Sequence, residues 1–128
     1  MDYLYSNFDN EIVEEYLMMW DGIEDMIDIV IESLESDYEG SINELFRTFH
    51  TLKSGSAFLG IDRISKFSHF VEEILDKARK KRLQNEKLQN LMDWLFLVSD
   101  QMHTWYEDLN KNRILSPINP KILKVPKV

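Results

Sequence analysis

One histidine in this chain, His50, lies in a helical run beside a lysine and several small residues. A neutral imidazole is a good nucleophile near neutral pH. Lys53 follows at i+3, where its ammonium can reach negative charge that develops on a group under attack. Ser54 and Gly55 add little bulk, although each costs a helix interior about 0.5 to 1 kcal/mol relative to good helix formers. These residue types at this spacing indicate a nucleophilic site that another protein can approach closely.

The helix that carries His50 has a clear apolar face. Its members recur at three- and four-residue spacing and are Ile42, Leu45, Phe49, Leu52, Ser56 and Leu59. His50 projects roughly 130° from the centre of that face, toward solvent. A lone solvent-facing histidine is usually a surface residue without function, but the unfavourable small residues around this one favour a functional site.

The composition indicates a single domain without disulfides. The chain has 128 residues and no cysteine, which excludes disulfides, thiolate catalysis and cysteine-ligated metal sites. No apolar run reaches the roughly 18 to 20 residues of a membrane span, and the acidic amino terminus lacks the basic start of a secretory signal. We therefore expect a cytoplasmic protein that does not bind membranes. We also expect the isolated domain to be a monomer.

The net charge of −8 is distributed unevenly along the chain. Residues 1–46 contain 14 Asp or Glu and no Lys or Arg, whereas all 15 basic residues come later. The densest basic group consists of Lys77, Arg79, Lys80, Lys81 and Arg82. Such charges at one helix end suit the helix dipole, and the overall charge repels a phosphate backbone, so nucleic-acid binding is not expected.

The hydrophobic pattern predicts four helices and no strands. The first spans about 9–34, and its apolar stripe contains Ile12, Val13, Tyr16, Trp20, Ile23, Ile27, Val30 and Leu34. The second is predicted to begin at Ser41, which has the spacing of a capping box with Glu44, and to end at Gly60 in the turn to the next helix.

The third and fourth helices complete the predicted bundle. Asp62 is predicted to cap the third, which continues to about Arg82 and buries Ile64, Phe67, Val71, Ile74, Leu75 and Ala78. The fourth spans about 86–110 and buries Leu88, Leu91, Met92, Leu95, Phe96, Val98, Met102, Tyr106 and Leu109. Short connections favour antiparallel neighbours, so residues 1–110 are predicted to form an all-α, up-down-up-down antiparallel four-helix bundle.

Residues 111–128 break the helical pattern. Pro117, Pro120 and Pro126 interrupt this segment, and its charges are all basic. A long helix is excluded there. The segment is predicted to be an irregular tail that rests on the bundle or a linker toward further domains.

The run from His50 to Gly60, HTLKSGSAFLG, resembles the signature of histidine phosphotransfer (HPt) domains. It is most similar to the version at the amino terminus of CheA-type chemotaxis histidine kinases. Residues 67–79 are similar to the third helix of that family. Two features differ: Ser54 stands where the family usually has glycine, and the tail offers no obvious equivalent of the family's additional carboxyl-terminal helix.

The resemblance implies a domain of a two-component or phosphorelay signalling system of the chemotaxis type. His50 would accept a phosphoryl group and pass it to the aspartate of a response-regulator receiver. The resemblance also implies that Glu72 accepts a hydrogen bond from His50 Nδ1–H, which fixes the tautomer and raises the basicity of the other nitrogen. Lys53 would stabilise the phosphoryl oxygens as charge develops on them.

The partners expected for such a domain would supply what the chain lacks. It has no Gly-rich phosphate loop and no Asp/Asn pattern for magnesium nucleotide, so we expect a phosphoryl carrier without a kinase site, intrinsic cofactor or metal. ATP would come from a histidine kinase catalytic domain and Mg²⁺ from the receiver's acidic pocket. Docking is expected at the residues that flank the site, which are Arg47, Thr51, Ser54, Gly55, Ala57, Phe58, Ser68 and His69.

Other protein classes fit parts of the sequence. A carboxylate-bridged metal bundle needs paired Glu-x-x-His motifs, and the nearest approach here is a single Asp100-x-x-His103. A stronger alternative is a non-catalytic interaction bundle of HPt-like fold, against which the presence of both His50 and Lys53 argues. The three tryptophans are either core or an aromatic docking patch. A free phosphorelay shuttle and a fragment of a larger kinase are both compatible with the sequence.

Overall fold

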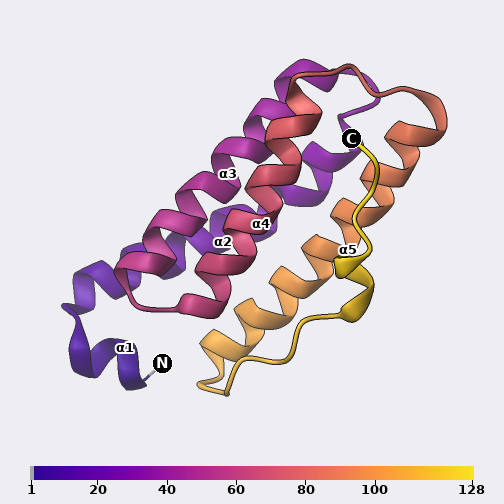
Figure 1. The fold of residues 1–128 in the computed structure, drawn as a ribbon. Helices are drawn as coiled ribbons and strands as arrows, with labels where there is room; N and C mark the ends of the chain where they lie inside the picture. The colour runs from indigo at the N-terminus through magenta and orange to yellow at the C-terminus, as the bar shows by residue number, and fades with distance from the viewer. Residues whose placement is uncertain (1) are drawn as a thin grey trace.

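The structure is a computed structural model that describes residues 2–128, with side chains from Leu4 onward. The predicted bundle range begins at Met1, which lies outside the described residues. The elements are α1 (Asp2–Asn7), α2 (Asn10–Glu32), α3 (Tyr38–Phe58), α4 (Asp62–Arg79), α5 (Asn85–Asn110) and a 3₁₀ helix, η1 (Pro120–Leu123). Figure 1 shows the four long helices side by side and running in alternating directions. Since residues 2–128 contain no strand, the predicted all-α antiparallel bundle is confirmed.

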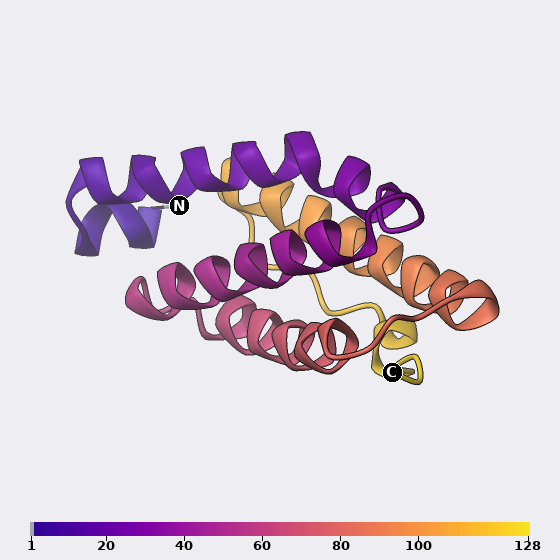
Figure 2. The same ribbon diagram turned by 90° about the horizontal axis from the view of Figure 1, so that it is seen from above.

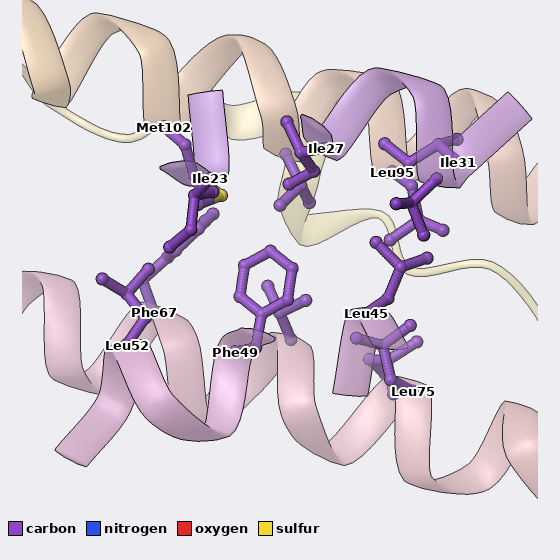
Figure 3. Packing of buried hydrophobic residues seen from close by; sticks show 14 of the residues in the cluster. Ile23, Ile27, Ile31, Leu45, Phe49, Leu52, Phe67, Leu75, Leu95 and Met102 are labelled. Carbon is purple, nitrogen blue, oxygen red and sulfur yellow. The ribbon is translucent and has the colours of Figure 1, made fainter. Parts of the chain in front are cut away.

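All four long helices contribute to one hydrophobic core (Figure 3). The stripes predicted for α3 and α4 are buried in full, and full burial of one large aliphatic side chain stabilises the fold by about 1.5 to 3 kcal/mol. Ile12 is the exception on α2, because it lies about 100° around the helix from buried Val13 and faces the surface. On α5, Leu88, Phe96 and Tyr106 are only partly buried but pack against the core.

The three tryptophans belong to the core. Trp20 and Trp105 are fully buried and Trp94 is nearly so. The Phe67 and Trp105 rings meet edge to face with 4.9 Å between ring centroids, which is a favourable aromatic geometry. An aromatic docking patch is therefore excluded for these side chains.

Helix α3 begins one turn earlier than predicted. Its N-cap is Asp37, whose side chain accepts a hydrogen bond from the Gly40 backbone N–H at 3.1 Å. The extra turn buries Tyr38, whose hydroxyl donates to the Ala78 carbonyl at 2.6 Å. The capping role predicted for Ser41 is wrong, because Asp37 provides a cap and Ser41 is a buried residue inside the helix.

Helix α4 also differs at both ends from the prediction. Asp62 is already the first helical residue, and the N-cap position belongs to Ile61 without a side-chain hydrogen bond. Asp62 therefore favours the helix through its charge near the positive end of the dipole and does not cap it. The helix ends at Arg79, three residues before Arg82. Leu83 is buried, and the chain turns there toward α5.

The amino-terminal segment adds a short helix that the periodicity did not predict. Figure 2 shows α1 folded back against the start of α2. Leu4 is buried, and the Phe8 ring lies 6.0 Å from the ring of Phe58, between centroids. Asp9 separates α1 from α2 and accepts a hydrogen bond from the Glu11 backbone N–H at 2.9 Å, so the predicted start of the long first helix is confirmed.

The carboxyl-terminal tail rests on the bundle and runs back along α5 (Figures 1 and 2). The Trp105 indole N–H donates to the Ser116 carbonyl at 2.7 Å, and the Trp94 indole N–H donates to the Ile122 carbonyl at 2.8 Å. Asp108 accepts from both the backbone N–H and the hydroxyl of Ser116. Ile122 is fully buried. These contacts make the tail part of the packed structure. Over the described residues, no helix is long and apolar enough to cross a membrane.

Candidate functional site

The turn between α3 and α4 decides which side chains of the two helices meet. Gly60 has a positive φ of 72°, a conformation that glycine adopts without strain. The Ile61 N–H donates to the Ser56 carbonyl at 2.9 Å and the Gly60 N–H to the Ala57 carbonyl at 3.1 Å, which is the Schellman pattern of a helix end. This turn, at the glycine predicted to provide it, folds α4 back along α3.

The antiparallel pairing brings Glu72 of α4 between His50 and Lys53 of α3. His50 Nδ1 lies 2.7 Å from Glu72 Oε2, and Lys53 Nζ donates to Glu72 Oε1 at 2.8 Å. Side-chain exposure is 58% for His50, 27% for Lys53 and 10% for Glu72. An ionised carboxylate only accepts hydrogen bonds, so Nδ1 carries the proton of the neutral imidazole. The lone pair is then on Nε2.

The charge of Glu72 follows from its two partners. Burial alone raises the pKa of this carboxyl group, but the hydrogen bonds from Lys53 and His50 outweigh it and bring the pKa below its ordinary value. Glu72 is therefore ionised at neutral pH. The carboxylate thus places a negative charge at one edge of the imidazole.

Two hydrogen bonds connect Lys53 to α4, one from its side chain and one at its backbone carbonyl. Its backbone carbonyl accepts a hydrogen bond from the Ser65 hydroxyl of α4 at 3.2 Å. The Lys53 ammonium has three donor protons, of which one is directed to Glu72. The remaining donors are available to oxygen atoms of a group bound at His50.

The predicted docking residues Thr51, Ser54, Gly55 and Phe58 line a shallow groove between α2 and α3, which His50 also lines. A Cβ added at Gly55 would lie 3.5 Å from the ring of Tyr16. That is an ordinary contact distance, so a glycine at position 55 is not required to prevent a clash.

Ser54, at the position where the HPt signature that this run resembles usually has glycine, forms a hydrogen bond within its own helix. Its hydroxyl donates to the His50 carbonyl at 3.2 Å, four residues earlier on α3. Mid-helix serines often form this kind of bond. The hydroxyl therefore has a partner within the helix and does not extend the site.

The other predicted docking residues lie in different environments. Arg47 and Ala57 are exposed on α3. His69 is exposed on α4, with Nε2 3.1 Å from Glu73 Oε1 and Nδ1 3.8 Å from Glu72 Oε1. This histidine thus lies at the edge of the Glu72 carboxylate.

The docking role predicted for Ser68 is wrong. The side chain is fully buried, and its hydroxyl donates to the Ile64 carbonyl at 2.7 Å. Ser68 lies four residues after Ile64 and three before Val71, both of which are buried. Its helix position, which the spacing already indicates, turns it toward the core and away from any partner.

Sequence reasoning did not identify Phe46 as part of the site. Its ring stacks with the His50 imidazole at 6.2 Å between centroids and 17° between planes. The guanidinium carbon of Arg79 lies 3.8 Å from the centroid of the same ring. The i, i+4 spacing of Phe46 and His50 on one helix is a signal that could have found the first contact.

A second histidine on the surface provides a comparison. His103 of α5 is also 58% exposed, and its Nδ1 lies 3.1 Å from Glu24 Oε2 of α2. Its Nε2 lies 3.2 Å from Glu107 Oε1, so carboxylates face both ring nitrogens. The hydrogen bond to Glu24 raises the pKa of His103, against a smaller opposing effect of burial. Neither ring nitrogen of His103 is thus open to a phosphoryl donor, which distinguishes this imidazole from that of His50.

Comparisons with known proteins show which family the sequence matches. The family model described as Hpt domain matches residues 16–111. The chemotaxis protein CheA of Borreliella burgdorferi is 34% identical over 97 residues, which are 70% of this chain and 11% of that protein. The sensor histidine kinase CheAY of Helicobacter pylori is 29% identical over 96 residues, or 73% of this chain and 12% of that protein.

In a further relative, too, the match covers only a small part of the relative's own length. The chemotaxis protein CheA of Halobacterium salinarum is 40% identical over 65 residues, which are 49% of this chain and 9% of that protein. No solved structure gives a match of comparable significance. The matched region is thus only about a tenth of each of these relatives.

Proposed function

Because the chain belongs to the Hpt domain family, we propose that it is a histidine phosphotransfer domain of chemotaxis-type two-component signalling in which His50 takes the phosphoryl group. The observation that carries this assignment to His50 is the 2.7 Å contact between its Nδ1 and Glu72 Oε2. That contact leaves Nε2 as the nucleophile, on a side chain that is more than half exposed.

The chemistry at His50 is a direct transfer. The Nε2 lone pair attacks phosphorus, the nitrogen–phosphorus bond forms, and the bond from phosphorus to the donor breaks with its electron pair leaving on the donor. The ring keeps its Nδ1 proton and becomes positively charged. Glu72 stabilises that charge, while the Lys53 ammonium stabilises the phosphoryl oxygens. In the onward step a receiver aspartate attacks phosphorus, and the electron pair of the broken bond returns to Nε2.

The proposed partners are a histidine kinase catalytic domain and a response-regulator receiver. The kinase domain would supply ATP as the source of the phosphoryl group, and the receiver would supply Mg²⁺ from its own acidic pocket. The chain would itself be a carrier, monomeric as an isolated domain and located in the cytoplasm. The groove between α2 and α3 beside His50 supports docking of a partner at this face.

Transfer to a receiver is the direct test. The domain is labelled with radioactive phosphoramidate, freed of donor, and mixed with a chemotaxis-type receiver domain and Mg²⁺. We expect the label to leave the domain and to appear on the receiver, and to remain on the domain when the receiver aspartate is replaced by asparagine. A domain that binds the receiver but never carries label would instead be a non-catalytic interaction bundle.

A further inference from the structure

The ring of Phe46 connects His50 to a cation on the neighbouring helix. Phe46 is partly buried, stacks with the imidazole at 17° between planes, and lies under the Arg79 guanidinium at 3.8 Å. A guanidinium this close to a ring face is attracted by the ring quadrupole. The three side chains therefore form a continuous set of contacts from the end of α4 to the imidazole.

Arg79 is itself held in place. Its Nε and Nη2 both lie 2.8 Å from Asp76 Oδ1, one turn earlier on α4. The planar guanidinium loses little further freedom when it covers an aromatic ring. The ion pair with Asp76 thus holds the Arg79 guanidinium over one face of the Phe46 ring. The Phe46 ring in turn stacks with the His50 imidazole.

The Glu72 hydrogen bond alone does not fix the plane of the His50 ring. It holds one atom, Nδ1, at one edge of the imidazole. The ring torsion of histidine has broad minima, and 58% of the side chain is exposed, so solvent on that side imposes no orientation. A flat neighbour in a nearly parallel plane restricts the rotation that the hydrogen bond permits.

We propose that Phe46, held by Arg79, is a positioning residue that sets the plane of the His50 imidazole and so directs Nε2 toward an incoming phosphoryl group. This inference rests on the proposed function of His50. Phe46 has no contact with the phosphoryl group in this scheme and acts through the imidazole. In this role the flat shape of the Phe46 ring restricts the imidazole, and an apolar side chain of similar volume without a ring would not.

The test uses phosphoramidate as donor, because a small molecule needs no docking surface on the domain. Phe46→Leu removes the flat ring and keeps an apolar side chain, whereas Phe46→Tyr keeps the ring. We expect Phe46→Leu to take up the phosphoryl group roughly threefold to tenfold more slowly than the wild type, the range that corresponds to loss of an aromatic pair. Phe46→Tyr should restore the rate.

Arg79→Gln provides a second variant at a more exposed position. It is expected to slow uptake by roughly twofold to fivefold, as loss of a cation–π contact predicts. Arg82→Gln is the matched control, because it removes the same charge three residues later, where the guanidinium lies 5.9 Å from the Tyr38 ring. Arg82→Gln should leave the rate unchanged. If Phe46→Leu fails to fold, the comparison of these two variants decides the question.

Chemical shifts of the His50 ring nitrogens, measured by NMR, separate positioning from a general loss of packing. In the wild type they should report an Nδ1-protonated tautomer, and in Phe46→Leu they should move toward a mixture of tautomers while the backbone spectrum outside the site is retained. Wild-type rates together with unchanged ring shifts in a folded Phe46→Leu would overturn the inference. A wild type that takes up no phosphoryl group would overturn the proposed function instead, and the ring shifts alone would then decide whether Phe46 positions His50.

Discussion

Replacement of Glu72 by Gln removes the negative charge beside His50 with little change of shape. Glu72 accepts hydrogen bonds from His50 at 2.7 Å and from Lys53 at 2.8 Å in a site where its side chain is 10% exposed. A hydrogen bond to a charged group contributes about 1.5 to 3 kcal/mol, against about 0.5 to 1.5 kcal/mol for a neutral acceptor such as the Gln amide. The hydrogen bond to the positively charged ring that forms during transfer is therefore weaker by about 1 to 2 kcal/mol in Glu72→Gln. This loss predicts that Glu72→Gln takes up the phosphoryl group roughly 5- to 30-fold more slowly than the wild type.

The same substitution should affect stability much less than rate. Lys53 is 27% exposed, so its ammonium can be solvated when the carboxylate is removed, and we expect the free energy of unfolding to fall by about 1 kcal/mol or less. The pKa of Glu72 is below its ordinary value of 4.5. Its ionised form therefore stabilises the fold above that pH, and this contribution is lost as the pH falls through the folded pKa. Glu72→Gln should lack that part of the acid dependence.

The assay compares the rate of phosphorylation by phosphoramidate with urea denaturation of the same variants. Glu73→Gln is the matched control, because Glu73 is the next residue on α4, is 61% exposed, and contacts His69. We expect the wild-type rate for Glu73→Gln and the reduced rate for Glu72→Gln. A folded Glu72→Gln that is phosphorylated as fast as the wild type would refute the role of the carboxylate.

Three further predictions concern the ammonium, the second histidine and the tail. Lys53→Ala should reduce phosphoryl uptake from phosphoramidate about tenfold without abolishing it, and an unchanged rate beside a Lys66→Ala control would count against the proposed stabilisation. Because the pKa of His103 is raised, its charged form stabilises the fold below pH 6.5, and this stabilisation is lost as the pH rises through the folded pKa. The urea midpoint of His103→Gln should therefore vary less with pH in that range than the midpoint of the wild type. An unaltered pH profile in His103→Gln would contradict this stabilisation. Removal of residues 113–128 should lower the free energy of unfolding, measured in urea, by about 3 kcal/mol. The reason is that the burial of Ile122 and the hydrogen bonds of two indole groups are lost. An unchanged urea midpoint would show that the tail adds no stability.

The architecture was predictable because burial in a helical bundle follows from spacing along single helices. Phe49 and Leu75 lie at core positions that the 3.6-residue period identifies without knowledge of any other helix. The start of α3 was not predicted correctly, since Asp37 and Ser41 are both good capping residues and only the burial of Tyr38 selects the earlier one. The helix α1 is too short for periodicity to distinguish it from a coil.

The site was predictable to the extent that it lies on one helix. His50 and Lys53 share a face of α3, so their proximity follows from the sequence. The approach of Glu72 depends on the register between α3 and α4, which the residues of α3 alone do not determine, and family resemblance supplied this pairing. The path of the tail was also beyond sequence reasoning, because its anchors Trp94 and Trp105 have the spacing of core residues and bond to carbonyl oxygens.

The most direct test of the central claim is the mass of the intact protein after incubation with phosphoramidate, compared for the wild type, His50→Gln and His103→Gln. His103 is a suitable control because it has the same exposure and a similar contact between Nδ1 and a glutamate. We predict an acid-labile addition of one phosphoryl group, about 80 Da, in the wild type and in His103→Gln, and none in His50→Gln. The same addition in a folded His50→Gln, or its absence from the wild type, would contradict the assignment of His50 as the phosphoacceptor.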